Sequence, residues 1–316
     1  MSVYRASLQL WSGRLAALIR LGRFRFLVGG VVLYALGVVM AGYMGATINW
    51  QVAIWGQIIV TATQLMTHYS NDYYDFEADH CNRTPTPWSG GSRVLQSGAL
   101  PRQTALIAAL ILASVAVIGV LLLAWRYRPG PLAVPIVLAA VALAWQYSAP
   151  PLKLHARGIG EICSMFIVAG LTPLLGFYLQ TGQITAFPMH ALVPLCCLQF
   201  SMLVSVDIPD ADGDAAADKR TLVVRLGRRA SARVYVVLLA LAYGLVILMM
   251  LAGLPAIVAV CFCLTLPLAL WLAWRVRKGD WSQAATWGRL AFFSIALLMS
   301  AAVLEAVGFV LLAMAR

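Results

Sequence analysis

The chain has 316 residues, of which 62% are hydrophobic and 11% are charged, and its net charge at pH 7 is +11. A mean hydropathy of +0.84 is far too high for a soluble domain, so the composition indicates a polytopic membrane protein embedded in a lipid bilayer. The basic residues are scattered over predicted loops, where topology and anionic lipid explain them. We therefore exclude nucleic acid as a partner.

Apolar stretches close to the length of a bilayer span recur along the chain, and mostly short connections separate them. Before them, residues 1–25 carry five Arg interleaved with Leu, Trp and Phe, which predicts a basic amphipathic segment on the membrane surface. Residues 26–316 are then expected to form one all-α domain of nine transmembrane helices. The predicted helices are 26–46, 51–70, 103–125, 131–148, 159–179, 189–206, 232–252, 255–274 and 289–313.

The distribution of Lys and Arg predicts the orientation in the membrane. If the N-terminus is cytoplasmic, every basic residue except Arg126, Arg128 and Arg316 falls in a cytoplasmic segment. The ends of the second and sixth predicted helices then also face the cytoplasm. We expect an integral membrane protein of a bacterial inner membrane.

Most of the 12 acidic residues lie in two clusters at those helix ends, and both clusters have offsets 0, 3, 5 and 7. Their members are Asp72, Asp75, Glu77 and Asp79, and Asp207, Asp210, Asp212 and Asp214. On a helix, offsets 0, 3 and 7 share one face, whereas offset 5 points away. Two such faces opposed across a cavity would form an oxygen-rich cage for hard divalent cations, a common way to hold a diphosphate.

Carboxylates this close repel one another and need a cation to remain ionised together. Mg²⁺ suits a diphosphate, because it binds through one or two carboxylates together with phosphate oxygens. His68 lies one turn before Asp72 and is a further candidate for the cavity wall.

The clusters belong to longer motifs. Asn71-Asp72-x-x-Asp75-x-x-x-Asp79 and Asp210-x-x-x-Asp214, each after a hydrophobic helix, resemble the two aspartate motifs of the UbiA-type intramembrane aromatic prenyltransferases. The resemblance covers nearly the whole chain. It extends through Gly90-Gly-Ser-Arg-Val-Leu-Gln-Ser-Gly98, Tyr147-Ser-Ala-Pro-Pro-Leu-Lys153 and Lys219-Arg-Thr-Leu-Val-Val-Arg-Leu-Gly227. Within the family, the glycine motif and the Asp-x-Asp-x-Asp segment are most similar to 1,4-dihydroxy-2-naphthoate polyprenyltransferases.

The resemblance implies a central cavity among the helices, open to lipid and covered by a cytoplasmic cap that carries both motifs. It also implies Mg²⁺-dependent transfer of a polyprenyl group from polyprenyl diphosphate to an aromatic acceptor, here 1,4-dihydroxy-2-naphthoate in menaquinone biosynthesis. The diphosphate leaves an allylic cation, which an electron-rich ring attacks in a pocket that excludes water.

Residue roles follow from the same resemblance. The implied catalytic residues are Asn71, Asp72, Asp75 and Asp210, and the implied Mg²⁺ ligands are Asp72, Asp75, Asp79, Asp210 and Asp214. The expected contacts to the diphosphate oxygens are Arg93, Lys153, Lys219 and Arg220. Further candidates are His68, Arg83, Arg157, Asp207 and Asp218.

The chain departs from the family pattern in two places. The spacing from Tyr147 to Lys153 is longer than in some members, which makes Arg157 an alternative to Lys153, and the second motif differs at Asp218. Asp218 stands where a glycine is common in the family, and it shares a face with Asp210 and Asp214 if the helix continues. Pro209 is expected to push Ile208 away from helical φ and ψ, which would turn Asp207 away from the site.

Two alternatives remain open. The acceptor of a family relative can differ, for example 4-hydroxybenzoate, a chlorin alcohol, a glycerol phosphate or a sugar phosphate. Asn82-Arg-Thr-Pro-Thr-Pro replaces the Asn-Arg-Pro-x-Arg-Pro run and argues against the chlorin and archaeal ether-lipid types. A cation-binding transporter is the other alternative, and it predicts acidic residues inside the spans rather than at helix ends.

Overall fold

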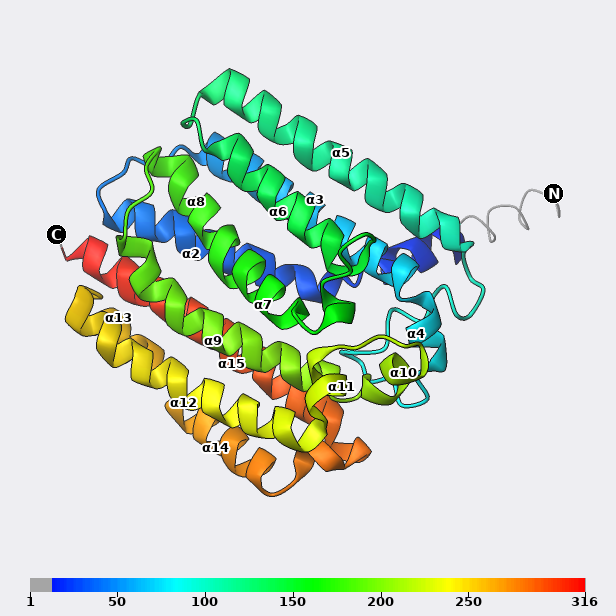
Figure 1. The fold of residues 1–316 in the computed structure, drawn as a ribbon. Helices are drawn as coiled ribbons and strands as arrows, with labels where there is room; N and C mark the ends of the chain where they lie inside the picture. The colour runs from blue at the N-terminus through cyan, green and yellow to red at the C-terminus, as the bar shows by residue number, and fades with distance from the viewer. Residues whose placement is uncertain (1–12, 316) are drawn as a thin grey trace, which may run out of the picture.

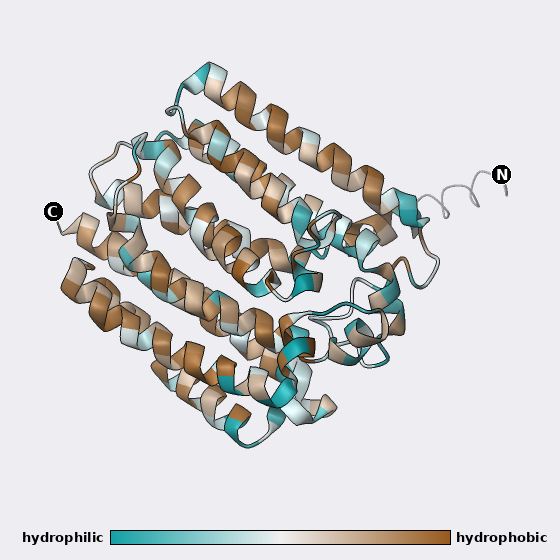
Figure 2. Cartoon of the chain, in the orientation of Figure 1, coloured by the Kyte–Doolittle hydropathy of each residue, from teal (hydrophilic) through white to brown (hydrophobic). Residues whose placement is uncertain are grey.

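A computed structural model describes residues 13–315 of the chain. All regular secondary structure in this range is helical, which confirms the prediction of an all-α fold. The long helices lie side by side in a bundle (Figure 1), and hydrophobic residues cover most of their length (Figure 2).

The long helices and their continuations form the body of the bundle. They are α2 (Leu27–Tyr43), α3 (Trp50–Tyr74), α5 (Arg102–Tyr127), α6 (Ala133–Ser148), α7 (Gly160–Ser164), the π-helix η3 (Met165–Leu171), α8 (Thr172–Thr181), α9 (Phe187–Asp207), α12 (Arg228–Ala252), α13 (Ala256–Cys263), α14 (Leu266–Arg277) and α15 (Ala284–Met314). Short helices connect them, namely η1 (Phe24–Phe26), α4 (Phe76–Cys81), η2 (His155–Arg157), α10 (Ala211–Ala216), α11 (Leu222–Leu226) and η4 (Asp280–Ser282).

All nine predicted segments contain helix, but the prediction of nine spans is not confirmed. In the described part of the chain, six helices are long and apolar enough to cross a membrane, or seven if α13 and α14, bent by 41°, form one span. The six are Gly13–Tyr43, Arg102–Tyr127, Gly160–Thr181, Phe187–Asp207, Arg228–Ala252 and Ala284–Met314. Of the other two, α6 has only 16 residues, and α3 carries polar side chains such as Gln64, His68 and Asn71.

Residues 1–12 of the predicted amphipathic segment lie outside the described residues. Residues 13–21 are helical, with Ala17 and Leu21 buried and Leu15 and Ile19 exposed. The placement of this segment on the membrane surface stays a prediction.

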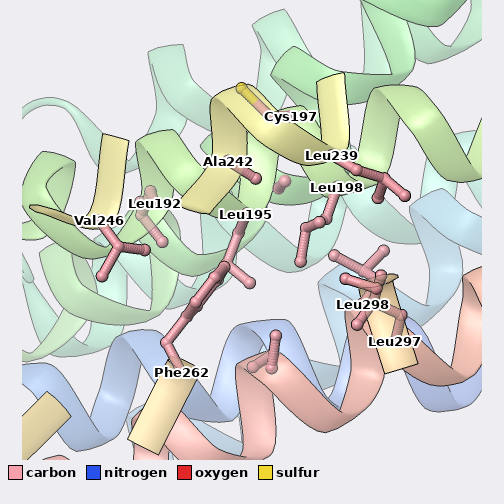
Figure 3. Close-up of a cluster of buried hydrophobic side chains, with 14 of the residues drawn as sticks. Leu192, Leu195, Cys197, Leu198, Leu239, Ala242, Val246, Phe262, Leu297 and Leu298 are labelled. Carbon is pink, nitrogen blue, oxygen red and sulfur yellow. The ribbon is translucent and has the colours of Figure 1, made fainter. Parts of the chain in front are cut away.

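Close packing holds the bundle together. Leu195 and Leu198 of α9 pack with Leu239 of α12, Phe262 of α13 and Leu298 of α15 in the largest apolar cluster (Figure 3). Between apolar helices in lipid, such contacts and small residues at crossing points provide the stabilisation, because the lipid is as apolar as the side chains.

Glycines set one of these crossings. A Cβ on Gly37 of α2 would overlap the Pro173 carbonyl of α8, and one on Gly176 of α8 would overlap the Tyr34 carbonyl of α2. The two helices therefore approach each other at glycine on both sides.

The short helices α4, α10 and α11 gather at one end of the bundle, where α3 and α9 end, and α15 ends at the opposite side (Figure 1). Hydrophilic residues concentrate in this group of short helices and loops (Figure 2). We call residues 71–98 and 207–221 the cap.

Candidate active site

The two acidic clusters meet in the cap because the helices that follow them pack together. The helix α4 continues the first cluster after α3, and α10 continues the second cluster after α9. A Cβ on Gly213 of α10 would lie 2.9 Å from the Cα atom of Asn82, so glycine is required for this approach.

A glycine-rich loop crosses both clusters. Gly90 and Gly91 have φ angles of 75° and 73°, a region that favours glycine, and a Cβ on Gly91 would overlap the Asp79 carboxylate. The Gly90 N–H donates to Asp210 Oδ2 at 3.1 Å, and two residues later the Ser92 N–H donates to Asp72 Oδ2 at 3.1 Å. One loop thus touches a carboxylate of each cluster.

Lys219 bridges the two clusters. Its Nζ atom lies 2.9 Å from Asp75 Oδ2 and 3.4 Å from Asp214 Oδ1. The Asn71 side chain donates to Asp75 Oδ2 at 2.7 Å and to Ser148 Oγ at 2.9 Å, so it connects the first cluster to α6. Asp75 is therefore held by a cation and an amide.

Asp72 has no exposed surface and forms an ion pair with Arg23. The Ser92 hydroxyl donates to the same carboxylate. Arg23 has a left-handed φ of 48° in the turn before η1, and it lines the cavity described below. Sequence reasoning missed this arginine because it placed residues 1–25 on the membrane surface, and no motif marks it.

Asp210 is held by neutral donors. The Asn82 side chain donates to Asp210 Oδ1 at 2.7 Å, and Gly90 donates to the other oxygen. Burial, together with the charges of Asp214 and Asp207, raises the pKa of Asp210 to about 7. Asn82 was not predicted as a site residue, although it lies three positions after the first cluster.

Two further carboxylates of the clusters also have raised pKa values. Burial raises the pKa of Asp79 and of Asp214 above the ordinary value, against the attraction of Arg23 and Lys219 respectively. Burial lowers the pKa of Lys219, but Asp75 and Asp214 outweigh it, so its pKa is raised and it stays charged. With their pKa values raised, these carboxylates take up a proton at a higher pH than an exposed carboxylate does. A bound cation would keep them ionised.

The donor set fits a hard divalent cation. Asp79 Oδ2 and Asp214 Oδ2 are buried and have no hydrogen-bond partner among residues 13–315. Oxygen donors from several carboxylates in one buried place are the ligands that Mg²⁺ prefers.

The structure corrects the expectation for Ile208, whereas Asp207 does face a different set of side chains from Asp214. Ile208 keeps helical angles of φ −54° and ψ −46°, and its N–H bonds to the Val204 carbonyl. Pro209 therefore does not end the helix early, because α9 is continuous up to Asp207 and the proline starts the turn to α10. Asp207 points into the cavity wall, where its Oδ2 lies 3.1 Å from His155 Nε2.

The carboxylates at offset 5 point away, as predicted. Glu77 and Asp212 are exposed, and they form surface ion pairs with Arg102 at 3.6 Å and with Arg228 at 3.0 Å.

Several other predicted residues lie away from the cavity. Exposed positions are occupied by Arg83, Lys153, Arg157, Asp218 and Arg220. Arg220 pairs with Asp218 at 3.2 Å, and Arg93 donates to the Asp79 carbonyl oxygen from a partly buried position. His68 does line the cavity, with its Nδ1 atom 2.8 Å from the Gly22 carbonyl oxygen.

The cap covers the polar end of a cavity of about 450 Å³ that runs between the helices. Asp75, Asp79, Asp210 and Lys219 line its polar end. Apolar residues from α3, α6, η3, α9 and α15 line the rest, among them Ile59, Val137, Leu171, Leu203 and Leu298. This arrangement suits a molecule with an anionic head and a long apolar tail.

Curated relatives share much of the sequence. The chain is 29% identical to the 1,4-dihydroxy-2-naphthoate octaprenyltransferase of Mycobacterium tuberculosis over 258 residues, which are 81% of this chain and 85% of the relative. It is 25% identical to the digeranylgeranylglyceryl phosphate synthase of Natronomonas pharaonis over 62% of this chain and 64% of the relative.

Solved structures share the fold. A UbiA homolog from Archaeoglobus fulgidus bound to DMAPP and Mg²⁺ aligns with a TM-score of 0.66 and 15% identity, over 92% of this chain and 99% of the homolog. A UbiA homolog from Aeropyrum pernix K1 aligns with a TM-score of 0.68 and 14% identity, over 91% of this chain and 98% of the homolog.

The family model of the UbiA prenyltransferase family matches residues 31–298, a range that contains both acidic clusters and most of the apolar cavity wall. The chain therefore belongs to the UbiA prenyltransferase family and is a prenyltransferase integral to a membrane.

Proposed function

We propose that the protein transfers a polyprenyl group from polyprenyl diphosphate to 1,4-dihydroxy-2-naphthoate, a step of menaquinone biosynthesis. One observation carries the donor half of this proposal: both acidic clusters and Lys219 meet at the polar end of an apolar cavity. The acceptor is proposed from the similarity to the 1,4-dihydroxy-2-naphthoate octaprenyltransferase of Mycobacterium tuberculosis.

Asp72, Asp75, Asp79, Asp210 and Asp214 would hold Mg²⁺ in this proposal. When bound, Mg²⁺ supplies positive charge that stabilises the diphosphate as it leaves. Asn71 keeps the Asp75 carboxylate in place through its 2.7 Å hydrogen bond.

Lys219 and Arg23 both line the cavity and form ion pairs with carboxylates of the first cluster. We assign both to the diphosphate oxygens, because charge-assisted hydrogen bonds to them strengthen as negative charge develops there. The exposed Lys153, Arg157 and Arg220 are less suited to this role than the sequence motifs indicate.

The apolar part of the cavity has two tasks. Residues such as Leu171 and Leu298 bind the prenyl tail, and they keep water from the allylic cation until the aromatic ring attacks it. The new bond joins a ring carbon to C1 of the prenyl chain, and the electron pair of the broken C1–O bond leaves with the diphosphate. The attacked ring carbon then loses the group it carried, as a proton or as carbon dioxide from a carboxylate, and the ring becomes aromatic again.

We further propose a bacterial inner membrane with the cap in the cytoplasm. The basic residues of 219–233 lie at the cap end, and among the described residues Arg126 and Arg128 lie at the opposite end of α5. Cys81 in the cap is exposed and offers a test of this orientation. A membrane-impermeant thiol reagent should label Cys81 in inverted vesicles but not in intact cells, and the reverse pattern would contradict it.

The function is tested with purified protein in lipid nanodiscs, Mg²⁺, one labelled polyprenyl diphosphate and a panel of acceptors. Prenylated 1,4-dihydroxy-2-naphthoate, identified by mass spectrometry, is the expected product. A product formed with 4-hydroxybenzoate or a glycerol phosphate instead would overturn the acceptor but keep the donor site.

A further inference from the structure

A second group of possible metal ligands lies beside the acidic clusters. His155 of η2, Glu161 of α7 and Asp207 at the end of α9 offer one ligand atom each, and these atoms all lie within 4.8 Å of one another. Asp207 Oδ2 lies 3.1 Å from His155 Nε2, whereas Lys219 contacts Asp75 and Asp214. Asp207 thus belongs to a different group of side chains from its neighbours Asp210 and Asp214.

Protein balances the charges of this group only in part, because a protonated His155 pairs with Asp207 but leaves Glu161 without a cation among the described residues. His155, Glu161 and Asp207 are only 6%, 1% and 3% exposed. Neither Glu161 oxygen has a hydrogen-bond partner among the described residues, and His155 is the one ion-pair partner of Asp207 among them. Buried carboxylates without sufficient countercharge are costly. One divalent cation with a neutral imidazole would balance both carboxylates.

The local sequence builds the group. A Cβ on Gly160 would lie 2.8 Å from the His155 Cα atom, so glycine is required to bring Glu161 beside the histidine. The ring of Tyr147 stacks on the imidazole with ring centroids 4.7 Å apart and planes inclined by 20°. These contacts fix the imidazole orientation while its Nδ1 atom has no hydrogen-bond partner among the described residues.

We propose that His155 Nε2, Glu161 and Asp207 bind a divalent transition-metal ion, such as Zn²⁺ or Mn²⁺, at a site separate from the diphosphate site. One imidazole nitrogen with two carboxylates is a ligand set that suits these ions better than Mg²⁺. His155 and Asp207 line the cavity, so an ion held by them would be accessible from it. A hydroxyl or carboxylate oxygen of the aromatic acceptor would take an open coordination position of this ion, a part of the proposal that rests on the proposed function.

The first test measures metal binding alone. Purified full-length protein is stripped with a chelator, equilibrated with Zn²⁺ in excess Mg²⁺ and analysed for bound zinc. The unmodified protein should retain one tightly bound Zn²⁺, and Glu161→Gln should weaken its affinity at least about tenfold. No tightly bound zinc, or equal binding by Glu161→Gln, would overturn the proposal.

The second test identifies the histidine. Bound Mn²⁺ or Cu²⁺ should show ¹⁴N coupling in pulsed electron paramagnetic resonance, because the all-oxygen diphosphate site has no nitrogen ligand. His155→Gln should remove this coupling, whereas the matched change His68→Gln in the same cavity should leave it. If His155→Gln does not fold, Asp207→Asn should weaken zinc binding instead, and an unchanged zinc affinity would overturn the proposal.

The third test concerns the acceptor. Adding 1,4-dihydroxy-2-naphthoate without prenyl donor should change the spectrum of the bound ion. An unchanged spectrum would overturn acceptor coordination. Because the metal measurements need no turnover, an inactive preparation would contradict the proposed function without affecting them.

Discussion

The two acidic clusters share one spacing but differ in their surroundings. In the first cluster, Asp72 pairs with Arg23 and Asp75 pairs with Lys219. In the second cluster, Asp210 receives hydrogen bonds from the neutral donors Asn82 and Gly90 and has no ion pair among residues 13–315. The two clusters have identical sequence spacing, but only the first has two of its carboxylates paired with Arg23 and Lys219. In the second, Asp210 has neutral donors only.

This difference in partners affects how readily Asp210 ionises. Asp210, with its pKa raised to about 7, is fully ionised near neutral pH only when a cation binds. Burial also raises the pKa of Asp79 in the first cluster and of Asp214 in the second, so both clusters should respond to metal and to pH. Asp210 differs from Asp214, which pairs with Lys219, because no ion pair among residues 13–315 offsets the burial of Asp210.

Removal of Mg²⁺ should have the largest effect. Chelation is expected to abolish turnover, and added Mg²⁺ should restore it. A non-hydrolysable prenyl diphosphate analogue should raise the melting temperature only when Mg²⁺ is present, because a ligand selective for the folded state stabilises it. Full activity in the presence of chelator would contradict a metal role for either cluster.

The pH dependence of this requirement tests the second cluster directly. Protons compete with Mg²⁺ for the Asp210 carboxylate, so the apparent Mg²⁺ affinity should fall as the pH drops below about 7. Asp210→Asn should weaken this dependence, measured by titrating Mg²⁺ at several pH values. An unchanged dependence would show that another group is responsible.

Removing one carboxylate from each cluster should have the next largest effect. Asp75→Ala and Asp210→Ala should each lower kcat by about 10²- to 10³-fold, as for other groups that stabilise transition-state charge. The double variant should lose much less than the two losses combined, because groups that act on one ligand are non-additive. Additive losses would mean that the clusters bind separate ligands.

Arg23, which pairs with the first cluster, can be compared with Lys153, which only the sequence motif indicates as a diphosphate contact. Arg23→Gln should raise the KM for prenyl diphosphate about tenfold or more, the effect of a lost charge-assisted hydrogen bond. Lys153→Gln should change it less than about twofold, since Lys153 is exposed. A larger effect of Lys153 in steady-state rates would show that its loop moves onto the substrate.

The neutral donor of the second cluster should matter less. Asn82→Ala removes the 2.7 Å hydrogen bond to Asp210 and should lower kcat about fivefold, since such bonds contribute about 1 kcal/mol. Asn49→Ala is a matched control, because Asn49 caps the N-terminus of α3, the end of the helix that lies away from the acidic clusters. It should lower stability by about 1 kcal/mol without changing kcat. Equal kinetic defects would point to a general effect on folding.

The outward carboxylates should show the smallest effect. Glu77→Gln and Asp212→Asn remove surface ion pairs and should change the free energy of unfolding by less than about 0.5 kcal/mol. Turnover should remain within about twofold of the unmodified protein. A Glu77 defect as severe as that of Asp75 would refute the argument from helix faces.

Local periodicity made part of this site predictable. The apolar stretches predicted the helical segments, and the offsets separated the inward carboxylates from Glu77 and Asp212. Both inferences depend on residues within a few turns of one another, where helix geometry decides which side chains share a face.

Local reasoning failed where a single residue was used to predict a direction. Pro209 suggested a break at Ile208, but the residue stays helical because α9 is packed along its length and the proline lies just beyond it. The exposure of Lys153 could not be read from its motif either, since it depends on the course of the loop after Ser148.

The sequence by itself determined the membrane class, the helical fold and the two acidic clusters that we propose to bind a diphosphate through Mg²⁺, because hydropathy and spacing are properties of short segments. Only the tertiary structure decided the partner of each carboxylate. Arg23 meets Asp72 across 49 positions, Asn82 meets Asp210 across 128, and His155 meets Asp207 across 52. These contacts depend on close packing of distant segments, for example at Gly160 and Gly213. Contacts between residues so far apart in the chain produce no periodic pattern in the sequence, so they could not be predicted from it.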